Sequence, residues 1–224
     1  KLRLEPLMPT PASTLTVRAL PDAAFGAEVT GLHPLRITQA HRELIWNTYK
    51  ERHGLICFSF GRLLDAEELH ALTKVFGKNE FAPGVINGIG KATPAGEESL
   101  SVDEQVKRLE AQGRDPYIGY SGNVDPSTLK VKSVNDKFFG EWEWHTDMSY
   151  IEVPPTFSLL HARQIPDDGG DTGFCSQVMA AHALSDELRA RALEIRVKHD
   201  STYGSSGVLR PGMAPPASPV DAPG

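Results

Sequence analysis

Short runs of alternating or apolar side chains along the chain predict a set of β-strands. In residues 14–19 polar and apolar side chains alternate, the pattern of a strand buried on one face. Residues 55–60, Leu-Ile-Cys-Phe-Ser-Phe, are largely apolar, which favours a buried strand. Six segments have one of these features: residues 14–19, 26–31, 55–60, 129–134, 156–162 and 173–176.

Helical spacing of apolar residues, together with capping residues, predicts helices between these strands. Thr38 caps a helix that runs to about His53, with Gly54 as its stop. Asp65, followed three residues later by a glutamate, forms a capping-box pattern, and the helix that follows ends at Gly77. Two further helices are predicted, one that begins with the capping box of Ser101 and Glu104 and one over residues 185–196.

This order of elements predicts a mainly β fold with flanking helices, as a sheet sandwich or barrel. We find no internal repeat and no strong linker, so residues 1–224 are expected to form a single domain. Residues 211–224 are rich in proline, alanine and glycine and have almost no core-forming side chains, which predicts a loop or a disordered segment.

Composition and charge narrow the class of protein. The net charge of −6 argues against nucleic acid as the main partner, since its binding requires a concentrated basic face. No apolar run approaches the roughly 20 residues needed to cross a bilayer, and residues 1–10 lack the apolar segment of a signal peptide. Cys57 and Cys175 do not suggest a disulfide framework. We therefore expect a cytoplasmic protein, and the composition leaves open whether it forms a homo-oligomer.

The feature with the clearest chemistry is the pair His145 and Asp147. In an extended segment, residues two positions apart project to the same face, so an imidazole nitrogen and a carboxylate oxygen can reach one cation. They would make two-thirds of the two-histidine, one-carboxylate set that binds non-haem iron and leaves positions open. By itself the pattern is weak, because a His-x-Asp tripeptide arises by chance about once in two chains of this kind. The plain alternative is a hydrogen-bonded pair at a strand end.

Further motifs around this pair occur in a characteristic order. The residues concerned are Trp144 to Tyr150, Pro154 and Pro155, Leu160 to Arg163, Pro166, and Gly169 to Thr172. Matches outside this stretch include residues 26–31, Phe76-Gly77, and the segment from Ala183 to Asp200. Together these motifs resemble the taurine and phenoxyacetate dioxygenase family, over about residues 14–200.

The resemblance implies a double-stranded β-helix (jelly roll) that holds Fe(II). By matching position, His145 and Asp147 would be two iron ligands, and Thr172 would donate a hydrogen bond to a carboxylate of 2-oxoglutarate. The implied activity is a dioxygenase that uses Fe(II), 2-oxoglutarate and O2 to hydroxylate a small organic substrate, with formation of succinate and CO2. Asn135, ten residues before His145, is a candidate for substrate contact.

Two parts of the family pattern have no match in this sequence. The family continues with a second histidine ligand and an arginine that pairs with the far carboxylate of 2-oxoglutarate. The histidines after Asp147 are His161, His182 and His199, and none has the position of a ligand in the family. We therefore expect the third ligand beyond Gly224, in a longer polypeptide.

Two other functions stay open at this point. One is a jelly-roll binding protein or inactive paralogue that uses the same pocket without turnover. The other is a metal-dependent hydrolase that holds Zn²⁺ through His145 and Asp147.

Overall fold

The computed structural model describes residues 15–82, 101–120, 144–168 and 171–199, together with residues 202, 203, 209, 214 and 215. The chain divides into two compact units, each assembled from two separate stretches. The first unit comprises residues 1–78 and 159–193, and the second comprises residues 79–158 and 194–224. In the described residues no helix is long and apolar enough to cross a membrane.

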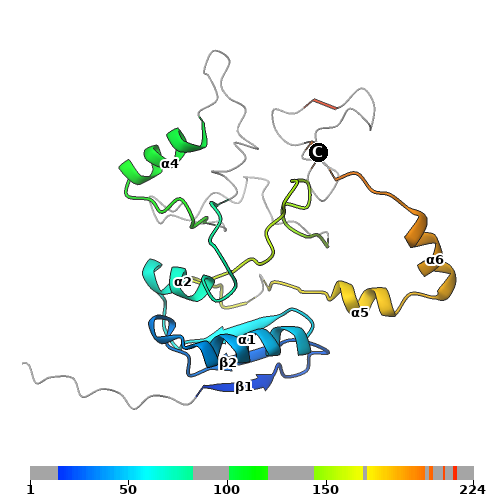
Figure 1. Ribbon diagram of the computed structural model, residues 1–224, viewed down its shortest axis with the longest axis horizontal. Coiled ribbons are helices and arrows are strands. Elements are labelled where there is room, and N and C mark those ends of the chain that lie inside the picture. The colour runs from blue at the N-terminus through cyan, green and yellow to red at the C-terminus, as the bar shows by residue number, and fades with distance from the viewer. Residues whose placement is uncertain are drawn as a thin grey trace, which may run out of the picture. The chain divides into compact units, whose positions relative to one another are not determined.

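A small mixed β-sheet forms the centre of the first unit (Figure 1). Its strands lie in the order β1-β2-β3, with bounds Thr16–Ala19, Ala27–Thr30 and Ile56–Ser59. The first two strands are antiparallel and pair Val17 with Val29. The second and third are parallel and pair Val29 with Phe58. Because side chains alternate along a strand, these three apolar residues lie on the same face of the sheet.

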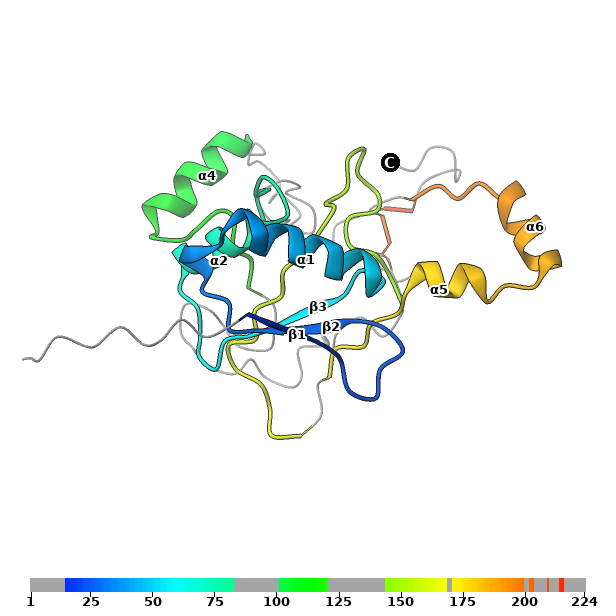
Figure 2. The same cartoon turned by 60° about the horizontal axis from the view of Figure 1, so that its bottom comes forward.

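The parallel pair is connected through η1 (Pro34–Arg36) and α1 (Gln39–Glu51), as a parallel connection requires a crossover. The hydroxyl of Thr38 accepts a hydrogen bond from the backbone N–H of His41, which satisfies one of the free donors at the start of α1. Gly54 follows the helix with a φ of +90°, a conformation that glycine adopts without strain. Helix α1 lies over one face of the sheet (Figure 2) and buries Ile45 and Thr48.

The hydrophobic core lies between this sheet, α1 and α2 (Ala66–Thr73). Its buried members come from strand, loop and helices: Val29, Leu32, Ile45, Leu64, Leu72 and Val75. Leu69 and Phe76 are partly buried against this cluster. Trp46 of α1 contacts the Phe76 ring with centroids 6.0 Å apart, so aromatic packing extends the core toward α2.

The loop before α2 is attached to the helix by an ion pair and a capping box. The Arg62 guanidinium donates two hydrogen bonds to the carboxylate of Glu68, at 2.7 Å and 2.5 Å. Glu68 also accepts a hydrogen bond from the N–H of Asp65, whose carboxylate accepts one from the N–H of Glu68. These contacts, with the Arg62 hydrogen bonds foremost, lower the pKa of Glu68 to about 2. The carboxylate is therefore ionised in the folded chain at any ordinary pH.

The sheet face opposite α1 is polar. Glu28 at its centre accepts hydrogen bonds from the hydroxyl of Ser59 at 2.7 Å and from the guanidinium of Arg18 at 2.9 Å. These two contacts, that with Ser59 first, hold the pKa of the Glu28 carboxyl below its usual range. The polar side chains of all three strands are therefore joined across this face.

The first unit ends with two helices that carry no buried residue, α5 (Gln177–His182) and most of α6 (Asp186–Glu194). Ser176 caps α5 by accepting a hydrogen bond from the N–H of Met179. Several apolar side chains of this region are exposed, among them Leu188 and Leu193.

In the described part of the second unit, α4 (Val102–Ala111) is the regular element. Ser101 and Glu104 form the capping box that its sequence predicts, with the Ser101 N–H donating to Glu104 at 2.8 Å. The turn after α4 returns to residue 82, where the N–H of Ala82 donates to the carbonyl of Pro116 at 2.8 Å. Beside it, the rings of Phe81 and Tyr117 stack with centroids 4.8 Å apart.

Comparison with the predicted elements gives a mixed result. The three N-terminal strands and the helices over 38–53, after Asp65, after Ser101 and over 185–196 are confirmed. The strands predicted at residues 156–162 and 173–176 are wrong, because both segments lack regular structure and the second leads directly into α5. A strand needs a partner for its backbone hydrogen bonds, and neither segment pairs with a strand among the described residues.

Other expectations are only partly addressed. Strand β3 was expected to be buried, but Cys57 and Ser59 on it are exposed, because they lie on the polar face of the sheet. Both cysteines are free, as expected. Residues 129–134 lie outside the described residues, as do all of residues 211–224 except Ala214 and Pro215. A mixed sheet with helices is present, whereas the single domain and the jelly roll stay predictions.

Candidate functional site

The segment around His145 and Asp147 is a turn in the second unit. Residues 144–146 are irregular, and residues 147–150 form a turn in which the N–H of Ile151 donates to the carbonyl of Met148 at 3.2 Å. Met148 has a φ of 54° and is buried, with 7% of its surface exposed. A left-handed conformation at a residue other than glycine is uncommon and points to local constraint. The side chains of His145 and Asp147 are therefore brought together by a turn at Asp147 and not by a regular strand.

The two predicted metal-binding side chains are in contact. The Nε2 atom of His145 lies 3.2 Å from the Oδ1 atom of Asp147. Two ligands at about 2.1 Å from one metal ion and at right angles to each other are separated by about 3 Å, so this spacing fits adjacent positions on one cation. The side chains are 36% and 65% exposed, which leaves them accessible to a metal ion and to further ligands. An imidazole with a carboxylate suits Fe(II) among other divalent metals.

A third ligand does not join them in the described residues, where no group of three or more metal-binding side chains occurs. The three downstream histidines have other surroundings. His161, in the first unit, accepts a hydrogen bond from the N–H of Leu64 at 3.3 Å, and burial lowers its pKa. His182 is the exposed last residue of α5. His199 contacts the hydroxyl of Ser149 through Nδ1 at 2.9 Å.

The other predicted site residues are placed less fully. Thr172 is exposed and belongs to the first unit, in the irregular stretch that leads to α5. Its hydrogen bond with 2-oxoglutarate stays a prediction. Asn135 lies outside the described residues, and its contact with substrate stays a prediction as well.

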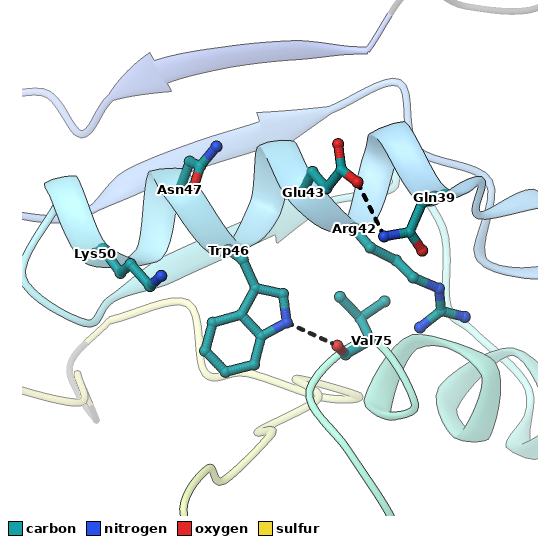
Figure 3. A pocket seen from close by; sticks show the side chains of 7 residues that line it. All are labelled: Gln39, Arg42, Glu43, Trp46, Asn47, Lys50 and Val75. Atoms are coloured by element: carbon teal, nitrogen blue, oxygen red, sulfur yellow. Dashed lines mark hydrogen bonds between the residues drawn. The ribbon is translucent and has the colours of Figure 1, made fainter.

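A surface depression of about 490 Å³ lies elsewhere, on α1 (Figure 3). It contains none of the predicted site residues; its lining consists of Gln39, Arg42, Glu43, Trp46, Asn47, Lys50 and Val75. Several of its polar groups are already engaged: the Trp46 indole N–H donates to the Val75 carbonyl at 3.0 Å, and Arg42 donates to the Lys74 carbonyl at 2.8 Å. These bonds attach α1 to the end of α2, which gives the polar lining a structural explanation.

The contact between Ser149 and His199 has no counterpart in the sequence patterns. Its partners are 50 positions apart, so neither helical nor strand periodicity connects them. The contact of His145 with Asp147, by contrast, was predicted from their short spacing, although a turn forms it in place of the extended segment that was expected.

Comparisons with known proteins identify the family of this chain. Residues 16–218 match the family described as taurine catabolism dioxygenase TauD, TfdA family. A (S)-phenoxypropionate/alpha-ketoglutarate-dioxygenase of Sphingobium herbicidovorans is 34% identical over 193 residues, which is 83% of this chain and 53% of the relative. An alpha-ketoglutarate-dependent sulfonate dioxygenase of Saccharomyces cerevisiae is 34% identical over 95 residues, 42% of this chain and 23% of that protein.

A third relative is an alpha-ketoglutarate-dependent 2,4-dichlorophenoxyacetate dioxygenase of Cupriavidus pinatubonensis, 34% identical over 61 residues, 27% of this chain and 21% of the relative. The chain spans about half the length of the first of these relatives and less of the others. No solved structure matches the chain significantly. Because the family match covers nearly all of residues 1–224 and includes the His145–Asp147 turn, the chain belongs to the TauD, TfdA dioxygenase family.

Proposed function

We propose that the protein is an Fe(II)- and 2-oxoglutarate-dependent dioxygenase that hydroxylates a small organic substrate. The observation that carries this proposal is the 3.2 Å contact between His145 Nε2 and Asp147 Oδ1, in an exposed turn within the family match. Both atoms are donors that a divalent metal accepts, and their separation suits neighbouring coordination positions. The fold proposed around them is the jelly roll implied by the family resemblance.

In this proposal the protein's own residues bind and orient the reactants. His145 and Asp147 would hold the iron through an imidazole nitrogen and a carboxylate oxygen. Thr172 donates a hydrogen bond to one carboxylate of 2-oxoglutarate, while Asn135 contacts the substrate. Bound Fe(II) supplies the chemistry that couples decarboxylation of 2-oxoglutarate to oxidation of a C–H bond by O2.

The overall reaction balances as substrate C–H, O2 and 2-oxoglutarate giving substrate C–OH, succinate and CO2. The relatives are named for phenoxypropionate, 2,4-dichlorophenoxyacetate and sulfonates. We therefore propose a small organic acid as the substrate class. If the oxidised carbon carries an ether oxygen or a sulfur substituent, the hydroxylated product fragments and releases that group. No nucleic acid or membrane partner is part of the proposal, and we infer a cytoplasmic location.

Succinate formation by the full-length protein tests this function. The protein is incubated with Fe(II), ascorbate, 2-oxoglutarate and O2, with a panel of aryloxy acids, alkyl sulfonates and sulfate esters. We expect succinate to form with at least one member of the panel, and expect His145→Ala and Asp147→Ala to abolish it. His182→Ala, at an exposed histidine at the end of α5, is the matched control and should retain activity.

The same measurements separate the alternatives. A binding protein without turnover would form no succinate with any substrate. The absence of succinate together with the absence of bound iron would refute the dioxygenase proposal. Turnover that proceeds equally well without O2 would instead favour a hydrolase.

A further inference from the structure

A side-chain contact attaches the turn that carries Asp147 to a part of the second unit that is distant in the sequence. Ser149, two residues after Asp147 in the same turn, has its Oγ atom 2.9 Å from Nδ1 of His199. Both residues belong to the second unit, although 50 positions separate them in sequence. The contact therefore joins the turn to the segment that follows α6.

The backbone of this turn is irregular. Its residues lie in neither a helix nor a strand, and its backbone bond from Ile151 N–H to Met148 C=O measures 3.2 Å, long for an N–H···O bond. Met148 holds a left-handed φ of 54°, which persists only where the surroundings impose it. Two side chains contribute to that constraint: the buried Met148 itself and Ser149 through His199. Met148 and Ser149 are the two residues that follow Asp147 in the sequence.

We propose that His199 is a positioning residue for the metal pair. By holding Ser149 it fixes the turn in the conformation that keeps the Asp147 carboxylate beside His145, at 3.2 Å. The inference rests on the proposed function, because it assigns the purpose of the turn to metal binding. His199 does not complete a ligand set with His145 and Asp147, because no group of three or more metal-binding side chains occurs in the described residues. It contributes by limiting the orientations that the carboxylate samples before the metal arrives.

Binding of Co(II), a redox-stable probe for the iron site, tests this inference in the full-length protein. The dissociation constant is measured from visible absorption without O2. His199→Leu and Ser149→Ala each remove one partner, and we expect each to weaken Co(II) binding about tenfold, as for other residues that orient metal ligands. The double variant should bind like either single variant, because both remove the same contact.

Two controls separate positioning from a general loss of structure. His199→Asn keeps a polar atom at the place of Nδ1 and should restore affinity to within about twofold of the unmodified protein, a rescue that depends on the hydrogen bond. Ser158→Ala changes an exposed serine of the same unit and should leave Co(II) binding unchanged. The ¹⁵N NMR signal of the His145 imidazole, recorded without metal, reports the contact between His145 and Asp147. It should shift in His199→Leu but not in Ser158→Ala.

The outcomes are distinct. If His199→Leu binds Co(II) as tightly as the unmodified protein, and the His145 signal does not move, the positioning role is wrong while the metal site stands. If Asp147→Ala binds Co(II) like the unmodified protein, the proposed function fails at its metal site, and the role of His199 fails with it.

Discussion

Replacing Glu68 by glutamine tests how strongly one buried carboxylate holds the loop before α2. Its side chain is 7% exposed and accepts two hydrogen bonds from Arg62 and one from the N–H of Asp65. Glutamine has nearly the same shape but no charge, and its NH2 group cannot accept the second Arg62 bond. The substitution therefore removes the charge-assisted part of the network and leaves the volume of the core unchanged.

The magnitude follows from the pKa. A fall from the ordinary value of 4.5 to about 2 corresponds to about 3 kcal/mol of stability at neutral pH. Because the Arg62 side chain is 50% exposed, solvent weakens the pair, and we expect about 1–2 kcal/mol to be lost in Glu68→Gln. The folded pKa is lower than the unfolded one, so this stability is present above about pH 4.5 and is lost as the pH falls through about 2.

Urea unfolding followed by circular dichroism, at pH values from 7 down to 3, measures the effect. The free energy of unfolding of Glu68→Gln should lie below that of the unmodified chain at pH 7, and the difference should narrow toward pH 3. Glu67→Gln is the matched control, because Glu67 is an exposed neighbour in the same first turn of α2. A difference that is absent at pH 7, or that does not change with pH, would refute the role given to the Arg62 pair.

Further predictions concern the core, one histidine and the site. Ile45→Ala, at a fully buried residue of α1, should destabilise the chain by about 3 kcal/mol in the same urea assay, and Ile45→Val by about 1 kcal/mol. Burial lowers the pKa of His161 from 6.5, so its imidazole should accept the hydrogen bond from the Leu64 N–H at pH 6.5 and above, and lose it as the pH falls through the lowered pKa. Hydrogen exchange should then show falling protection of the Leu64 N–H, and no such change in His161→Leu. Thr172→Val should raise the KM for 2-oxoglutarate about tenfold, with an unchanged circular dichroism spectrum, if its hydroxyl binds the cosubstrate. Asp147→Asn should reduce succinate formation at least about a hundredfold, measured beside iron content; activity near that of the unmodified protein would remove Asp147 from the metal site.

The sequence by itself determined the features that depend on neighbours a few positions apart. Thr38, Asp65 and Ser101 each cap the helix that their spacing predicts, because a cap needs only a side-chain oxygen and an N–H two or three residues later. The contact of His145 with Asp147 is of the same kind, since two positions separate them. Ordered motifs, and not the spacing alone, then connected that pair to a family.

Only the tertiary structure decided the features that need a distant partner. Residues 156–162 have the composition of a strand, yet they form none, because strand pairing is settled by what lies alongside. Cys57 is exposed because it lies on the face of the sheet that α1 does not cover (Figure 2). The attachment of the Asp147 turn to His199 spans 50 positions, a distance over which no local pattern carries information. Local hydrogen bonds depend on residues that are neighbours in the sequence, whereas packing and long-range contacts form only when the chain has folded.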